Sequence, residues 1–173
     1  MYNRKKRELI FESPWMQLFL DDVIDHNDNP LKYNVVHTTG DSVVAVVKKD
    51  HFYLMAEVYR YPIGQVQHEF PAGGIESGET PQEAAIREVW EETGVKISCQ
   101  ETVYSFYPSN GILDQKMHVV FADYVNGEPE VREEILNCYW LKEEELMEAV
   151  LAGEITDAPT LVALFYDRLR HRL

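Results

Sequence analysis

A short helix with clearly marked ends lies near the middle of this 173-residue chain. Thr80-Pro81-Gln82-Glu83 combines a threonine cap, a proline at the first helical position and a glutamate three residues after the cap, which is the pattern of a capping box. Gly94 suits the left-handed residue that follows a helix. These signals predict a helix over residues 81–93, directly after the glycine-rich segment Pro71-Ala72-Gly73-Gly74.

Three glutamates share one face of this helix. Glu88, Glu91 and Glu92 stand at i, i+3 and i+4, within an arc of roughly 100°. No Lys or Arg of the helix lies four residues from Glu88 or Glu92, and like charges at that spacing cost about 0.2–0.5 kcal/mol per pair. The helix dipole disfavours an anion at this end by about 0.3–1 kcal/mol. Bound Mg²⁺ or Mn²⁺ would offset both costs, because these ions prefer carboxylate oxygens.

Strand patterns surround the helix. The apolar run Val43–Val47 is typical of a strand covered on both faces, and residues 52–59 are its expected hairpin partner. Residues 15–36 predict two antiparallel strands joined by a turn at residues 26–30. Further strands are predicted at 67–70, 95–106, 116–124 and 135–141, and helices at 142–152 and 159–170. This order predicts an α/β sandwich with a mixed sheet.

Composition narrows the range of partners. The chain has 16 Lys and Arg against 30 Asp and Glu, a formal charge of −14, and its one basic cluster is the short arm Arg4 to Arg7. Such a charge disfavours nucleic acid as a partner. No apolar run is long enough to cross a membrane, and the start lacks a signal-peptide pattern. The two cysteines are far apart, so we expect no disulfide framework and a cytoplasmic location.

The segment from Gly73 to Val95 carries a longer motif. Gly73 is followed after five residues by Glu79, and after seven more by Arg87-Glu88-Val89-Trp90-Glu91-Glu92-Thr93-Gly94-Val95. This pattern resembles the signature of the Nudix hydrolases at every fixed position. The resemblance implies an α/β/α sandwich whose loop and helix bind Mg²⁺, or Mn²⁺, and a pyrophosphate. It implies metal ligation by Glu88, Glu91, Glu92 and the carbonyl of Ala72, a catalytic role for Glu88 and Glu92, a structural Gly73, and a structural ion pair between Arg87 and Glu79.

The resemblance extends over most of the chain. Tyr59-Arg60-Tyr61-Pro62, Glu69-Phe70-Pro71-Ala72-Gly73, Pro108-Ser109-Asn110-Gly111 and Ser13-Pro14-Trp15 are similar to the ADP-ribose pyrophosphatase group. This group implies a homodimer in which residues 1–40 form N-terminal antiparallel strands and residues 41–173 form the Nudix domain. By the same resemblance, Trp15 stacks on the substrate base and Arg60 contacts its phosphates. A core tryptophan and a surface ion pair are the structural alternatives for these two residues.

The expected reaction is hydrolysis of a nucleoside diphosphate sugar, such as ADP-ribose, to a nucleoside monophosphate and a sugar phosphate. Many group members carry Glu where this chain has Gln115, and some ADP-ribose hydrolases carry Pro where it has Asn110, so other nucleoside diphosphate sugars remain candidate substrates. Two alternatives stay open: a hydrolase of dinucleoside polyphosphates or nucleoside triphosphates, and a noncatalytic sensor of nucleotide sugars. Metal-bound glutamates are poor proton acceptors. The base is therefore expected outside the motif, and the resemblance to the ADP-ribose pyrophosphatases implies Glu133 or Glu134, in the polar loop before residue 135. Two solvated loop charges are the alternative for these residues.

Overall fold

The computed structural model describes residues 1–132 and 135–170. The described chain divides into two compact units. One unit contains Met1–Asp41 and Tyr107–Lys116, and the other contains Ser42–Phe106 and the chain from Met117 onward. The loop 107–116 therefore belongs with the N-terminal strands, although the boundary predicted at residues 40 and 41 places it in the second unit.

The N-terminal unit is an antiparallel sheet of order β1-β2-β3. Its strands are β1 (Asn3–Glu12), β2 (Met16–Ile24) and β3 (Pro30–Thr38). The predicted turn joins β2 and β3, and the Asp25 carboxylate accepts hydrogen bonds from the backbone N–H groups of Asn27 and Asn29. Residues 107–116 lie along β3, where the Val36 N–H donates to the Ile112 carbonyl at 2.8 Å.

The basic cluster at the N-terminus is part of a strand and not a separate arm. Every residue of β1 is exposed, so the strand has no buried stripe for sequence analysis to detect. One of these basic residues, Arg7, has a structural role. Its guanidinium forms two hydrogen bonds, at 2.8 and 2.7 Å, with the buried Asp21 carboxylate of β2. This ion pair lowers the pKa of Asp21.

The second unit contains a mixed sheet of order β10-β5-β4-β9-β8, with β6 paired to β5 and β7 paired to β4. The strands are β4 (Ser42–Lys49), β5 (Phe52–Arg60), β6 (Gln65–Glu69), β7 (Ala72–Gly74), β8 (Lys96–Phe106), β9 (Met117–Asn126) and β10 (Ile135–Lys142). A 3-10 turn at Tyr61–Ile63 separates β5 from β6. β4 and β9 are parallel, and the other pairs are antiparallel, which confirms the predicted mixed sheet.

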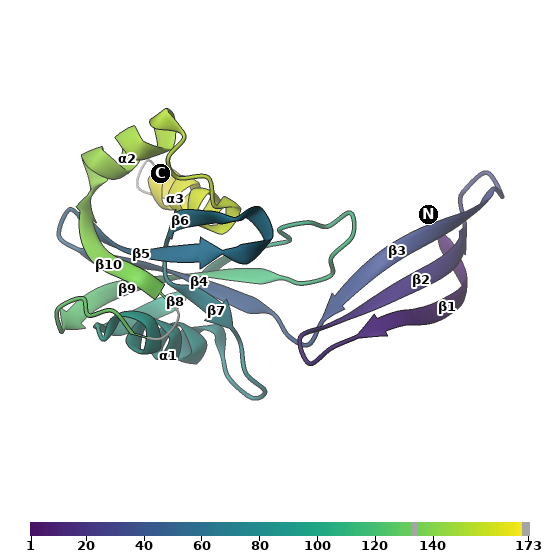
Figure 1. The fold of residues 1–173 in the computed structure, drawn as a ribbon, viewed down its shortest axis with the longest axis horizontal. Helices are drawn as coiled ribbons and strands as arrows, with labels where there is room; N and C mark the ends of the chain where they lie inside the picture. The colour runs from purple at the N-terminus through teal and green to yellow at the C-terminus, as the bar shows by residue number, and fades with distance from the viewer. Residues whose placement is uncertain (133–134, 171–173) are drawn as a thin grey trace. The chain divides into compact units, whose positions relative to one another are not determined.

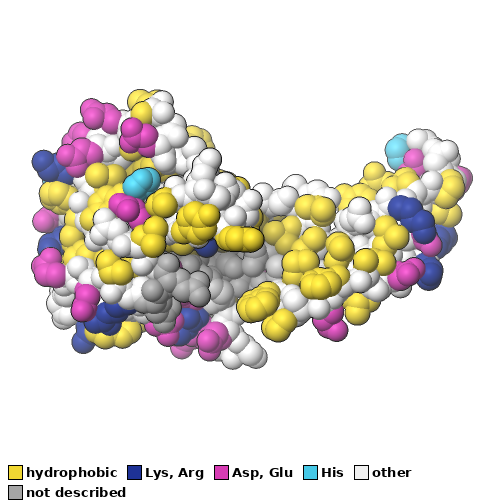
Figure 2. All heavy atoms as spheres, in the orientation of Figure 1, with side chains coloured by type: hydrophobic (Ala, Val, Ile, Leu, Met, Phe, Trp, Pro, Cys, Tyr) yellow, Lys and Arg dark blue, Asp and Glu magenta, His cyan; other side chains and the backbone are white. Residues whose placement is uncertain are grey.

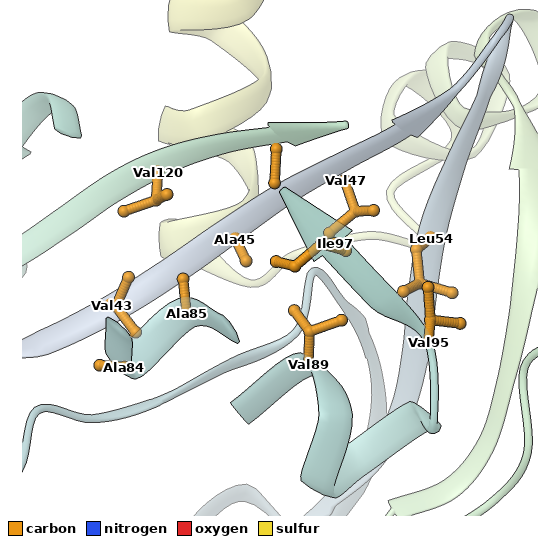
Figure 3. Close-up of a cluster of buried hydrophobic side chains, with 11 residues drawn as sticks. Val43, Ala45, Val47, Leu54, Ala84, Ala85, Val89, Val95, Ile97 and Val120 are labelled. Carbon is orange, nitrogen blue, oxygen red and sulfur yellow. The ribbon is translucent and has the colours of Figure 1, made fainter. Parts of the chain in front are cut away.

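Helices cover both faces of this sheet (Figure 1). They are α1 (Pro81–Thr93), α2 (Glu143–Ala152) and α3 (Ala158–Arg170). The apolar face of α1, with Ala84, Ala85 and Val89, packs on alternate residues of β4 (Figure 3). Leu146 of α2 and Leu164 of α3 belong to a second core on the remaining β4 residues. The run Val43–Val47 is buried throughout, so the predicted α/β/α sandwich is confirmed.

No helix in the described ranges is long and apolar enough to cross a membrane. Figure 2 shows magenta Asp and Glu side chains spread over the face in view, where dark blue Lys and Arg side chains are fewer. This surface agrees with the formal charge of −14.

Candidate active site

Helix α1 has the ends that its sequence predicts. The Thr80 side chain accepts a hydrogen bond from the Glu83 N–H, and the Glu83 side chain accepts one from the Thr80 N–H, so the capping box is complete. Gly94 closes the helix in the left-handed conformation at φ 69°, and its N–H donates to the Trp90 carbonyl at 3.0 Å. The Gly94 cap therefore determines where the last turn of α1, which contains Glu91 and Glu92, ends.

Strand β7 brings the glycine-rich segment against α1. Gly73 pairs with Val43 of β4 on one side. A Cβ atom on Gly73 would lie 2.1 Å from the carboxyl carbon of Glu88, far inside van der Waals contact. Only glycine leaves room for the Glu88 carboxylate so close to the backbone, which gives the predicted structural role of Gly73 a steric basis.

Arg87 connects the loop and the helix. Its guanidinium bonds the Glu79 carboxylate at 2.9 and 3.0 Å and the Gly74 carbonyl at 2.8 Å. The same group bonds Glu88 and Glu91, each at 2.9 Å. Hydrogen bonding to Arg87 lowers the pKa of Glu79 to about 2. Glu88 therefore has a cationic partner although no Lys or Arg of the helix lies four residues from it, because Arg87 reaches it from the adjacent position. Arg87 reaches Glu91 from one turn earlier.

Glu92 has different surroundings from its two neighbours. Its Oε2 atom is buried and lacks a hydrogen-bond partner among the described residues. The carboxylate receives a backbone hydrogen bond from Ala72. Burial, together with the charge of Glu88, raises the pKa of Glu92 to about 8. A buried carboxylate oxygen without a partner is rare and needs an explanation, which a bound cation would provide.

The donor set fits a divalent cation. Three carboxylates and the Ala72 carbonyl are the hard oxygen donors that Mg²⁺ and Mn²⁺ prefer, and the Oε2 atom of Glu92 is available to one. Among residues 1–132 and 135–170, however, no three His, Cys, Asp or Glu side chains are grouped closely enough to hold a metal ion. Glu88 and Glu91 would have to exchange bonds with Arg87 for bonds with a cation.

Arg60 lies at the end of β5 and pairs across to β6. Its guanidinium forms two hydrogen bonds with the Glu69 carboxylate, one of them at 2.8 Å. Glu69 is 3% exposed, whereas about half of the Arg60 side chain is exposed. Glu69 therefore orients Arg60 and leaves part of the guanidinium accessible. The sequence offered no signal for this partner.

Of the remaining predicted site residues, the structure describes Trp15 but not the two candidate bases. Trp15 lies between β1 and β2 of the N-terminal unit and is 76% exposed, so it is not a core tryptophan of this chain. Glu133 and Glu134, the candidate bases, lie outside the described residues.

The segment just before those glutamates is held at the C-terminal end of α1, a contact that sequence analysis missed. The Glu130 and Arg132 N–H groups donate to the Thr93 and Glu92 carbonyls, at 2.9 and 3.2 Å. The Arg132 guanidinium lies 4.4 Å from the centre of the Trp90 ring. Unpaired carbonyls at a helix end attract such donors and cations. The turn signal Asn126-Gly127 marks where this segment begins, but nothing local shows where it packs.

The fold and the residues around α1 define the class of protein. The family model for the NUDIX domain matches residues 37–164. The chain therefore belongs to the Nudix family, as its motif suggested, and is a Nudix pyrophosphohydrolase.

Several relatives make the comparison more specific. The ADP-ribose pyrophosphatase of Bacillus subtilis (strain 168) is 30% identical over 171 residues, covering 96% of this chain and 92% of that protein. The methanol dehydrogenase activator of Bacillus methanolicus is 30% identical over 172 residues, with 97% and 93% covered. The ADP-sugar pyrophosphatase of Mus musculus is 30% identical over 132 residues, with 70% and 60% covered. A solved structure of an ADP compounds hydrolase shares the fold, with a TM-score of 0.85 and 20% identity over 99% of this chain and 94% of that one.

Proposed function

We propose that the protein hydrolyses the pyrophosphate bond of ADP-ribose or a related nucleoside diphosphate sugar, with Mg²⁺ or Mn²⁺ as cofactor. The observation that carries this proposal is the buried Oε2 atom of Glu92, which has no hydrogen-bond partner among the described residues and lies next to Glu88 in a Nudix domain. The substrate class is supported by the two pyrophosphatases among the relatives, one of which matches nearly the whole chain.

Glu88, Glu91, Glu92 and the Ala72 carbonyl would hold the cation. When bound, a divalent cation neutralises charge on the pyrophosphate oxygens and lowers the pKa of a bound water. Arg87 and Glu79 keep the loop on the helix, and the capping box fixes where the helix begins. Arg60, oriented by Glu69, contacts a substrate phosphate with the exposed part of its guanidinium.

The remaining assignments rest on the resemblance to the ADP-ribose pyrophosphatase group. Trp15 is exposed and available to stack on the base, an interaction worth about 1–3 kcal/mol. Glu133 or Glu134 accepts the proton of the attacking water. We also infer a homodimer in the cytoplasm, for which the free thiols of Cys99 and Cys138 are in keeping with a reducing compartment.

A substrate panel tests the proposal. Metal-free protein is assayed with ADP-ribose, ADP-glucose, GDP-mannose, NADH and diadenosine tetraphosphate, each with Mg²⁺ and with Mn²⁺, and the products are separated by chromatography. We expect a nucleoside diphosphate sugar to give the highest kcat/KM and to yield a nucleoside monophosphate and a sugar phosphate. A preference for diadenosine tetraphosphate would contradict the substrate class. Binding of a nucleotide sugar without metal-dependent turnover would indicate a sensor instead.

A further inference from the structure

The corner between β6 and β7 lies directly before the candidate cation site. β6 ends at Glu69 and β7 begins at Ala72, so the backbone of Phe70 and Pro71 lies outside both strands. Phe70 is 1% exposed, and a buried N–H group needs a partner. The Phe70 N–H donates to the side-chain oxygen of Thr160 at 2.9 Å, 90 residues away in sequence.

A second threonine, two residues before α3 begins, bonds the same segment. The Thr156 hydroxyl donates to the Gln67 side-chain oxygen at 2.7 Å, and Gln67 is buried in β6. Thr160 is itself fixed, because it is fully buried and its N–H donates to the Asp157 carboxylate at 2.8 Å. Figure 1 shows α3 beside β6, in agreement with these contacts. We call Thr156 and Thr160 the threonine pair.

We propose that the threonine pair positions the site, with Thr160 as the main positioning residue. Glu69, which orients Arg60, directly precedes Phe70. Ala72, which hydrogen-bonds Glu92, follows Phe70 by two residues. The hydrogen bond to Phe70 therefore fixes the backbone between these two groups, in addition to the strand pairing of Glu69 with Ala56 and of Ala72 with Val44. This inference rests on the proposed function, since it treats Ala72 and Glu92 as cation ligands and Arg60 as a substrate contact.

Thr160 does not hold α3 in place alone. Ala163 and Leu164 of the helix are buried in the core, and the Tyr53 hydroxyl donates to the Asp167 carboxylate at 2.7 Å. Loss of the Thr160 hydroxyl therefore leaves the helix packed and removes the partner of the Phe70 N–H, while the Pro71 carbonyl still accepts a hydrogen bond from the Ala45 N–H at 2.8 Å. The Tyr53 contact supplies a matched control, because it attaches the same helix from its far half.

The test compares Thr160→Val, which keeps the side-chain shape but loses the acceptor, with Thr160→Ser, which keeps it. Mn²⁺ binding to metal-free protein is measured by electron paramagnetic resonance, and kcat and KM are measured with ADP-ribose. We expect Thr160→Val to raise the Kd for Mn²⁺ by about 10–100-fold, as when other groups that orient metal ligands are lost. It should also raise KM. Thr160→Ser should restore most of the affinity.

Two further variants separate positioning from stability. Tyr53→Phe should lower the melting temperature and leave the Kd for Mn²⁺ unchanged. Thr156→Val, at an exposed residue, should weaken Mn²⁺ binding in the same direction as Thr160→Val, and it decides the question if Thr160→Val does not fold. Unchanged Mn²⁺ affinity in a folded Thr160→Val variant, or an equal loss in Tyr53→Phe, would overturn the inference.

The outcome also distinguishes this inference from the proposed function. If the wild-type protein hydrolyses ADP-ribose while Thr160→Val binds Mn²⁺ normally, the positioning role is wrong and the function stands. If Mn²⁺ binding depends on Thr160 but ADP-ribose is not hydrolysed, the positioning role stands and the substrate is wrong.

Discussion

Glu92 shows how surroundings give neighbouring glutamates different roles. Glu88 and Glu91 each accept a hydrogen bond from Arg87, whereas the Oε2 atom of Glu92 is buried and lacks a protein partner in the described chain. Desolvation is the largest cause of its raised pKa, and the Glu88 charge adds to it. A carboxylate that is costly to ionise alone is well suited to a cation that would pair with it.

Replacement of this carboxylate tests the cation site directly. We predict that Glu92→Gln abolishes hydrolysis because the change removes a ligand. The fold should stay intact or become slightly more stable, because a neutral amide avoids the cost of ionising a buried carboxyl beside Glu88. The measurements are kcat with Mg²⁺ and the melting temperature, with Glu144→Gln on the exposed face of α2 as control. A variant that keeps more than about a tenth of the wild-type kcat, a barrier change of only ~1.4 kcal/mol, would contradict the assignment.

The raised pKa of Glu92 predicts how the stability of metal-free protein varies with pH. The carboxyl holds its proton up to a pKa of about 8 in the folded chain, against an ordinary value of 4.5, so folding takes up a proton between these values. The stabilising contribution is complete below about pH 4.5 and is lost as the pH rises through about 8. Urea midpoints measured in EDTA from pH 5 to 8.5 should fall for wild type relative to Glu92→Gln. Parallel curves would show that the Glu92 pKa is not raised.

At the scale of elements, the segment Gly127–Arg132, which follows β9 in sequence, is hydrogen-bonded to the C-terminal end of α1. Backbone hydrogen bonds to the Glu92 and Thr93 carbonyls and the Arg132 contact with Trp90 hold the residues that directly precede Glu133 and Glu134. The last turn of α1 and this segment are therefore fixed to one another. A general base must lie within about 2.6–3.2 Å of its proton donor, and the proposed base, Glu133 or Glu134, directly follows this segment in sequence.

The position of the base follows as a prediction for Glu133→Gln and Glu134→Gln. We expect one variant, Glu134→Gln by slight preference, to lose about 10²–10⁴ in kcat, the usual effect of removing a general base. Its Mn²⁺ affinity should stay at the wild-type value, because neither residue is among the proposed ligands. The other variant serves as the matched control. Near-normal kcat in both would place the base within the motif itself.

At the scale of the whole molecule, the N-terminal sheet exposes an unusual amount of apolar surface. All of β1 is exposed, including Leu9, Ile10 and Phe11, and Trp15 follows it. Figure 2 shows hydrophobic side chains, in yellow, gathered over this unit. Large exposed apolar patches mark interaction surfaces, and a second copy of the chain is the partner that the family resemblance implies.

We therefore predict a homodimer that depends on the N-terminal sheet. Light scattering at micromolar concentration should give twice the mass of one chain, and a Leu9→Glu, Phe11→Glu double variant should lower the measured mass. A Lys5→Glu, Glu8→Lys double variant, which changes two exposed residues of the same strand that are already charged, should leave the mass unchanged. A fully active wild-type monomer would contradict the prediction.

Local signals in the sequence determined helix α1, the mixed character of the sheet and the family. A capping box, a left-handed glycine and the spacing of Glu88, Glu91 and Glu92 are each encoded within a few residues, so they can be interpreted without the fold. The same holds for the buried run Val43–Val47, whose apolar continuity already indicated cover on both faces. Strand β1 escaped detection because, with no buried face, it has no period to detect.

Only the tertiary structure decided which polar groups meet. Glu69 orients Arg60 because β6 pairs with β5, and Thr160 binds Phe70 from 90 residues away. The Arg132 N–H binds the Glu92 carbonyl because the chain after β9 returns to the end of α1. Buried donors and acceptors are satisfied by whichever groups the packing brings within about 3 Å, and that choice depends on elements far apart in sequence. Residue types and spacing therefore specified the chemistry of the site, while long-range packing specified the partners that hold it in place.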